Sequence, residues 1–271
     1  MVTVGPLHIP EATPYAHHHA EEAVGFDWPV GGWVRGYRLD LLDKDGRLLP
    51  REMLHRAGVV NLDRRQLPYP MAERLLAVGR ETGPVTLPDS RGVPLAPAQR
   101  LVLYYALVNA TADPIDGATL RLAMTWTPER AHPPRDVFPL FMDANPKAQG
   151  GNTRAYDVPP GVSITAAEFT LPVSGWVRAV GGQLHDYAVE IRLEDVQTNK
   201  VLVRLKARRR ADGRITALSS KRFLLKRHGL RLDANRVYRV VGVYDNPTGD
   251  TIPAGAMAFM AGPFIPEAGA S

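Results

Sequence analysis

The 271-residue chain contains no cysteine. A disulfide framework, a thiolate nucleophile and a zinc–thiolate site are therefore excluded. Long apolar runs are missing as well, because no stretch approaches the roughly 20 apolar residues that a membrane helix needs, and we expect no membrane span. Residues 1–6 lack the basic start and apolar run of a signal peptide. We expect either a cytoplasmic protein or a mature form with an added methionine.

The composition favours β-structure. The 24 glycines and 24 prolines are too many for long helices but suit short strands joined by turns. Apolar residues make up 45% of the chain and charged residues 23%, which is ordinary for a globular protein. The length allows one large domain or two modest ones.

The net charge of +5 is unevenly distributed. Residues 204–231 contain 11 Lys or Arg and a single acid, Asp212. These cations alternate with apolar residues such as Val203 and Leu205, which is typical of the solvated face of a hairpin. An anion-binding surface is the other interpretation. Because the segment lacks the stacking aromatics of single-strand binders, we favour the solvated face and expect no nucleic-acid partner.

The chain divides into three predicted parts. Residues 1–30 show little periodicity and are interpreted as an extended arm. A first β-sandwich domain is expected over 31–158 and a second over 159–271, with the boundary near 157–161. Alternating apolar residues over 33–41, closed by Asp-Lys-Asp-Gly, predict a strand and a hairpin turn. Residues 70–77 predict one short helix, with Pro70 at its first position.

The second half has a regular strand pattern, joined by short turns of Asn, Gly, Asp and Pro. Strands are predicted near 163–171, 175–182, 185–195, 200–209, 221–226, 236–245 and 255–261. Residues 128–161 contain no clear strand until their end. The spacing indicates an antiparallel sandwich or jelly roll. We therefore predict an all-β protein of two antiparallel jelly-roll-type β-sandwich domains.

Two residues carry possible metal chemistry. The sequence has no glycine-rich phosphate loop and no Gly-x-Ser-x-Gly elbow. If no bulge intervenes, alternation places His185 on the apolar side of its strand, where a histidine is either a hydrogen-bonded core residue or a ligand. Met257 either fills the core or offers a soft thioether to Cu(I).

Three segments carry a family resemblance. Residues 181–187 (Gly-Gly-Gln-Leu-His-Asp-Tyr), 243–249 (Val-Tyr-Asp-Asn-Pro-Thr-Gly) and 255–257 (Gly-Ala-Met) resemble the second domain of copper type II, ascorbate-dependent monooxygenases. This family includes the peptidylglycine α-hydroxylating enzymes. Residues 53–57 and 59–62 are similar to the part of the first domain that carries a His-His pair. The resemblance extends over roughly residues 33–262.

The resemblance implies two jelly rolls, each holding one copper ion. In this family the second-domain copper is bound by a His-x-His pair and a methionine and activates oxygen, whereas the first-domain copper stores an electron. His185 matches the second histidine of His-x-His, Met257 matches the methionine, and His55 matches the first histidine of the His-His pair. The resemblance also favours an extracytoplasmic location.

The sequence departs from the family at both sites. Gln183 replaces the first histidine of His-x-His, and Arg56 replaces the second of His-His. A neutral amide is a poor copper ligand, and a protonated guanidinium is none. The third ligand of the first domain has no clear match, and His132 is the nearest candidate. Residues 17–19 (His-His-His) either supply a missing ligand or form an adventitious metal-binding tract, which we favour.

Three hypotheses follow. The first is a copper-binding protein, with His185, Met257 and His55 as metal ligands, whose hydroxylating activity is reduced or lost. The alternative is a double β-sandwich interaction or scaffold module without metal. The third is an anion-binding module that uses residues 204–231. The sequence does not give the substrate or the oligomeric state.

Overall fold

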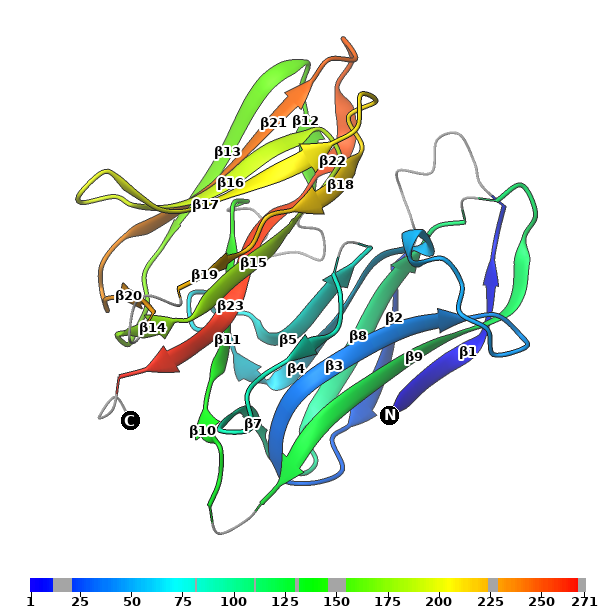
Figure 1. Ribbon diagram of the computed structural model, residues 1–271, viewed down its shortest axis with the longest axis horizontal. Helices are drawn as coiled ribbons and strands as arrows, with labels where there is room; N and C mark the ends of the chain where they lie inside the picture. Colours follow the sequence, from blue (N-terminus) through cyan, green and yellow to red (C-terminus); the bar gives the residue numbers. More distant parts are fainter. Residues whose placement is uncertain are drawn as a thin grey trace. The chain divides into compact units, whose positions relative to one another are not determined.

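The computed structural model describes residues 1–11, 21–80, 82–109, 111–129, 132–145, 155–223 and 229–267. The chain forms two compact units. Unit 1 comprises Met1–Arg64 and Ala72–Val137, and unit 2 comprises Arg65–Met71 and Phe138–Ser271. Figure 1 shows the strands of both units.

Unit 1 consists of strands and one 3-10 turn, η1 (Arg51–Met53). Its strands are β1 (Val2–Ile9), β2 (Glu22–Asp27), β3 (Gly32–Leu42), β4 (Leu54–Arg65), β5 (Ala72–Gly79), β6 (Val85–Thr86), β7 (Arg91–Leu95), β8 (Arg100–Leu107), β9 (Ile115–Pro128) and β10 (Arg135–Asp136). One sheet has the order β1-β9-β3-β7-β10, with β6 also paired to β3, and the other has the order β2-β8-β4-β5. A core that includes Leu39, Val59, Leu103 and Leu122 draws its members from both sheets.

Unit 2 repeats this arrangement. Its strands are β11 (Phe138–Asp143), β12 (Tyr156–Val158), β13 (Gly161–Phe169), β14 (Gly175–Val177), β15 (Ala179–Leu184), β16 (Ala188–Asp195), β17 (Lys200–Arg209), β18 (Ile215–Leu218), β19 (Lys221–Arg222), β20 (Leu230–Leu232), β21 (Tyr238–Asn246), β22 (Ile252–Ala256) and β23 (Ala258–Pro266). One sheet joins β19, β15, β23, β14 and β20, with β11 also paired to β23, and the other has the order β13-β21-β16-β17-β18. Strands β12 and β22 form a separate pair. The core includes Met142, Ile191, Leu205 and Phe264.

The strand order defines a jelly roll in both units. In unit 1 the chain passes between the sheets so that β1, β3, β7 and β9 lie in one and β2, β4, β5 and β8 in the other. In unit 2, β11, β15, β19 and β23 lie in one sheet and β13, β16, β17 and β21 in the other. The neighbours match as well, since β1-β9-β3-β7 corresponds to β11-β23-β15-β19 and β2-β8-β4-β5 to β13-β21-β16-β17. This is the eight-stranded, two-sheet jelly-roll pattern, and the predicted all-β class is confirmed.

The same hydrogen-bonded loop follows β8 in unit 1 and β21 in unit 2. Its sequence is Asn-x-Thr-x-Asp, at residues 109–113 and 246–250. In each loop the asparagine Nδ2 donates to the carbonyl of the aspartate at 2.7 Å, and the asparagine Oδ1 accepts from the backbone and the hydroxyl of the threonine. Both asparagines are buried. The two units thus share a loop as well as a topology.

Two expectations about chain organisation were wrong. The predicted arm over 1–30 contributes β1 and β2, which pair with β9 and β8. Unit 2 begins its main segment at Phe138 rather than near 159, because β11 lies in the region that was interpreted as strand-free. Pro139 obscured this strand, but proline is tolerated there since β11 pairs only with β23 among the described strands.

The predicted helix over 70–77 is also wrong. Strand β5 occupies Ala72–Gly79, and the only helical turn in the described residues is η1. Leu76 and Val78, two residues apart, are both buried in the core of unit 1. Burial at a period of two therefore outweighed the helical propensity of Leu and Ala. No described helix has the length and apolar character to cross a membrane.

Strand β5 also buries a carboxylate. Glu73 is 3% exposed and lies 3.3 Å from the guanidinium of Arg64. Its second oxygen, Oε2, is buried without a hydrogen-bond partner among the described residues. Burial raises the pKa of Glu73 to about 7, although the positive charge of Arg64 lowers it in part.

The raised pKa of Glu73 predicts a stability loss on alkalinisation. The folded state keeps the proton up to about pH 7, whereas the unfolded chain releases it near its ordinary pKa of 4.5. The stabilising contribution is therefore complete below about pH 4.5 and is lost as the pH rises to about 7. Glu73→Gln should remove this slope and be the more stable protein at pH 8, by about 3 kcal/mol at most. Urea unfolding at pH 5 and pH 8 measures the difference; Glu52→Gln, at an exposed acid, is the control, and equal slopes would contradict the prediction.

Candidate metal centre

His185 and Met257 lie at the end of one strand and the beginning of its neighbour. Strand β15 ends at Leu184 and β23 begins at Ala258. These two residues face each other in the antiparallel ladder, and Gln183 faces Phe259. His185 and Met257 each stand one residue beyond the last pair. The structure thus brings together two of the three predicted ligands.

The hydroxyl of Tyr244 connects these two positions. The backbone N–H of His185 donates to this oxygen at 3.3 Å, and the hydroxyl donates to the carbonyl of Met257 at 2.8 Å. Tyr244 belongs to β21 in the opposite sheet, so its side chain crosses the sandwich core. Burial raises the pKa of Tyr244 well above its usual value, so the hydroxyl keeps its proton.

His185 does not lie in a strand, as had been predicted for 185–195. Residues 185–187 form a turn between β15 and β16, and Tyr187 has a φ of 67°. A register shift between Ala188 and Glu190 then follows in the pairing of β16 with β21. Because a bulge reverses the alternation of side chains, the predicted apolar face does not extend back to His185.

Three neighbouring segments hold this turn. The backbone N–H of Tyr187 donates to the carbonyl of Gly213 at 2.8 Å, and its carbonyl accepts from the N–H of Asp245 at 2.9 Å. The guanidinium of Arg209 donates to the same carbonyl at 3.2 Å. Gly213 has a φ of +83°, and a Cβ there would lie 2.3 Å from the ring of Tyr187. The turn that carries His185 is therefore fixed by backbone contacts.

Gln183 and Met257 are buried outside the core of the sandwich. Each is 5% exposed, and neither is among the residues packed between the two sheets. Within β15, Gln183 is next to Leu184, which packs in the core, so the side chain of Gln183 points away from that core. His185 is half-buried, and its Nε2 atom is shielded from solvent. The donors at this corner are one imidazole, one thioether and one amide.

The other candidate ligands lie elsewhere. His55 is half-buried at the second residue of β4 in unit 1, where the ladder with β8 shifts register. Its neighbour Arg56 forms an ion pair with Glu21 at 3.0 Å. His132 is exposed in unit 1. Residues 17–19 lie outside the described residues. In the described ranges no group of three or more His, Asp or Glu side chains gathers as a metal site would require.

Sequence reasoning missed Tyr244 and Arg209. The signal for Tyr244 was present, because Tyr238, Val240, Gly242 and Tyr244 alternate along β21 and share its core-facing side. A tyrosine hydroxyl in a core must find partners. Arg209 gave no such signal, since it is one of three consecutive arginines with the same chemistry.

Comparison with known proteins gives structural similarity alone. No family model matches the sequence, and no curated protein matches it. The STIV MCP is 12% identical, with a TM-score of 0.42, over 90% of this chain and 92% of that one. The major capsid protein P2 from bacteriophage PM2 is 10% identical, with a TM-score of 0.36, over the whole of both chains. PNGF-II is 8% identical, with a TM-score of 0.39, over 96% of this chain and 65% of that one. All three TM-scores are below 0.5, so none of these similarities bears on function.

The three consecutive arginines should differ in their effect on stability. Arg209 is half-buried and bound to Tyr187 and Asp245, whereas Arg208 and Arg210 are exposed. Arg209→Gln should lower the free energy of unfolding by about 1 kcal/mol because the hydrogen bonds to the turn are lost. Arg208→Gln and Arg210→Gln, the matched controls, should stay within about 0.5 kcal/mol of the parent. Denaturant unfolding of the three variants decides, and equal effects would show that Arg209 does not hold the turn.

Proposed function

We propose that unit 2 binds Cu(I) through His185 and Met257 and that the protein does not hydroxylate efficiently. The observation that supports this proposal most is the pairing of β15 with β23, which ends at Leu184 and Ala258 and so leaves the backbone positions of His185 and Met257 next to each other. Imidazole binds either copper state and a thioether prefers Cu(I). The two residues come from segments that resemble the copper monooxygenases, and they occupy adjacent backbone positions around Tyr244.

The donor set fits a low-coordinate Cu(I) site better than a complete oxygen-activating one. Gln183 occupies the position where the resemblance expects the first histidine of the His-x-His pair, and its amide is a poor copper ligand. Copper held here would supply one-electron redox chemistry. The residues of the chain contribute one imidazole, one soft thioether and a fixed turn.

Unit 1 does not fit a copper ion. His55 has the cationic Arg56 beside it in the sequence, and Arg56 is engaged with Glu21. A guanidinium cannot act as a ligand and repels a second cation nearby. We therefore propose no role for His55 in metal binding, and no step that needs a second copper follows from the residues of unit 1.

The second candidate function is a metal-free double β-sandwich module for interactions. It is favoured by the small number of donors, since the described residues contain no cluster of three or more His, Asp or Glu. The two candidates differ in one measurable property, which is Cu(I) affinity that depends on His185.

Cu(I) binding should depend on both proposed ligands. His185→Ala should weaken binding by at least about tenfold because the imidazole is lost, and Met257→Leu should weaken it while preserving volume. Met260→Leu is the matched control, since Met260 is equally buried on β23 but belongs to the sandwich core. Competition against a Cu(I) chelator, with protein purified without a nickel column, measures the affinities. Unchanged binding in His185→Ala would exclude the site.

Ascorbate-dependent oxygen uptake should stay at background, and rapid turnover coupled to product would contradict the proposal that the protein does not hydroxylate efficiently.

Restoring the missing histidine should strengthen the site. Gln183→His creates a His-x-His sequence at the end of β15, and the second imidazole should tighten Cu(I) binding by at least about tenfold. Gln183→Asn keeps an amide and should not tighten it. X-ray absorption at the copper edge counts the imidazoles in each protein. A gain in affinity without an added nitrogen ligand would show that position 183 acts in another way.

A further inference from the structure

Strand β17 carries a row of cations on its outer side. Val203 and Leu205 are 3% and 0% exposed, whereas the alternate residues Lys206 and Arg208, and Arg210 just beyond the strand, are exposed. Since side chains two apart in a strand project to the same side, these cations follow one another at about 6.6 Å. The sequence expectation of an alternating hairpin is met here.

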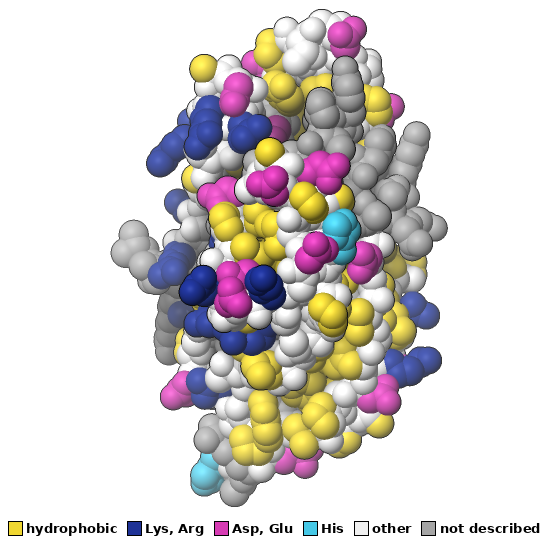
Figure 2. All heavy atoms as spheres, turned by 90° about the vertical axis from the view of Figure 1, so that its right-hand side faces the viewer, with side chains coloured by type: hydrophobic (Ala, Val, Ile, Leu, Met, Phe, Trp, Pro, Cys, Tyr) yellow, Lys and Arg dark blue, Asp and Glu magenta, His cyan; other side chains and the backbone are white. Residues whose placement is uncertain are grey.

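Other basic residues of the same sheet are neutralised. Arg192 contacts Glu190 at 2.8 Å and Glu194 at 3.0 Å, and Arg204 contacts Glu190 at 2.7 Å. On β21, Arg239 contacts Glu168 at 2.7 Å. Elsewhere on the surface, basic and acidic side chains also lie in mixed groups (Figure 2). Paired charges are thus the usual arrangement in this protein.

The outer half of β17 departs from that arrangement. Lys206, Arg208 and Arg210 form no ion pair with any residue in the described part of the chain. Of the described acids near the row, Asp212 accepts the backbone N–H of Arg214 within the turn, and Glu190, which faces Lys206 in the β16–β17 ladder, is held by Arg192 and Arg204. Like charges at this spacing repel one another, so the row has an electrostatic cost, which Glu190, already shared by two arginines, offsets only in part.

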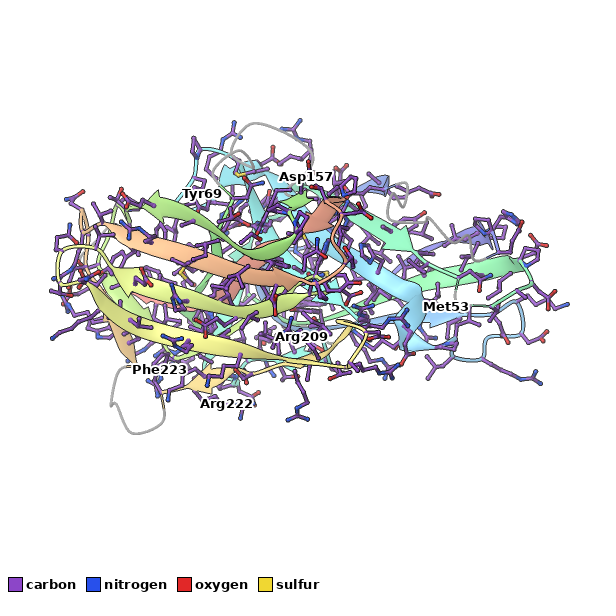
Figure 3. The ribbon with its side chains drawn as sticks, turned by 90° about the horizontal axis from the view of Figure 1, so that it is seen from above. Met53, Tyr69, Asp157, Arg209, Arg222 and Phe223 are labelled. Carbon is purple, nitrogen blue, oxygen red and sulfur yellow. The ribbon has the colours of Figure 1, made fainter. Side chains whose placement is uncertain are left out.

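Further cations continue the row toward β19. Lys206 and Ser219 exchange hydrogen bonds of 2.8 and 3.0 Å, and Ser219 leads directly to β19. Both residues of β19, Lys221 and Arg222, are exposed. Figure 3 shows Arg222 next to Phe223 at the margin of unit 2. We call Lys206, Arg208, Arg210, Arg214, Lys221 and Arg222 the basic ridge.

We propose that the basic ridge binds a linear anionic polysaccharide, recognised by its sulfate or carboxylate groups. Arginine, which makes up four of the six residues, holds planar or tetrahedral oxyanions through paired N–H donors. A single line of cations matches one charged chain rather than the two phosphate rows of a duplex. The site is separate from the proposed copper centre and does not depend on it.

The surroundings of the ridge disfavour other polyanions. The ridge includes no aromatic residue. Among the described residues beside it, Phe223 is 8% exposed and the half-buried ring of Tyr187 packs against Gly213, so neither presents a free face to stack on a base. Val203 and Leu205 of β17 face the core, and Val201, which is 45% exposed, lies at the start of the strand and outside the ridge. The ridge itself therefore has no apolar side chain to insert into a lipid surface. Charge and hydrogen bonding alone remain as the means of recognition.

The test uses the full chain and a fluorescent heparin oligosaccharide of defined length. Fluorescence anisotropy at several salt concentrations should show binding that weakens steeply with salt, since bound counterions are released. The triple change Lys206→Gln, Arg208→Gln and Arg210→Gln should weaken binding by at least about tenfold and reduce the log–log salt slope by about three. The matched control is Lys44→Gln, Arg47→Gln and Arg135→Gln, which removes three exposed cations of unit 1 and should leave binding within about twofold.

Several outcomes would overturn the proposal. Equal weakening in both triple variants would show that net charge, not the ridge, attracts heparin. Unchanged binding in the ridge variant would place the site elsewhere. Tighter binding of a 20-base-pair DNA duplex or of anionic vesicles than of heparin would assign the ridge to nucleic acid or membrane. Absence of heparin binding at physiological salt would remove the site altogether. Circular dichroism confirms that the ridge variant keeps its β-structure.

Discussion

The corner of unit 2 that carries His185 and Met257 depends on one buried hydroxyl. Tyr244 reaches across the sandwich from β21, accepts the N–H of His185 and donates to the carbonyl of Met257. Both of these backbone groups lie beyond the last pair of the β15–β23 ladder, so the hydroxyl takes the place of a ladder partner. A buried hydroxyl is itself costly unless it is hydrogen-bonded. The contact therefore satisfies three polar groups at once and fixes the distance between the two chain segments.

The sequence predicts the strands of the fold where burial alternates cleanly. Lys200–Arg209 was expected at the same bounds, because Val203 and Leu205 alternate with charges. Strand β5 was not predicted, since its Leu and Ala content favours a helix and only the sandwich core selects the extended form. Strand β11 was not predicted because it contains Pro139. Proline is tolerated at a sheet edge, and which strand lies at an edge depends on the assembled sheet. These failures come from tertiary context, which a local pattern does not contain.

The candidate site was predicted in part for the same reason. The residue types and the proximity of His185 to Met257 followed from short segments of sequence. The local conformation did not, because it is set by distant partners: Gly213 accepts from the turn, Asp245 donates to it, and Arg209 binds its carbonyl. A strand with no bulge would have pointed His185 toward the core. The turn and the register shift at Ala188 instead separate His185 from the alternation of β16.

Comparison of the two units shows that the scaffold is repeated while the ligands are not. The two units share the Asn-x-Thr-x-Asp loop, but the seven residues that follow it differ. Residues 251–257 of unit 2 end in Met257, whereas residues 114–120 of unit 1 contain no methionine, so unit 1 lacks a thioether in this segment. Its histidine, His55, precedes a cation that is already paired with Glu21. The hydrogen bonds of the loop recur in both units, whereas a soft donor in the segment after the loop is found in unit 2 alone. The thioether of Met257 in one unit fits the proposal of a single Cu(I) ion in unit 2. A single copper ion supplies one electron, whereas oxygen activation consumes two.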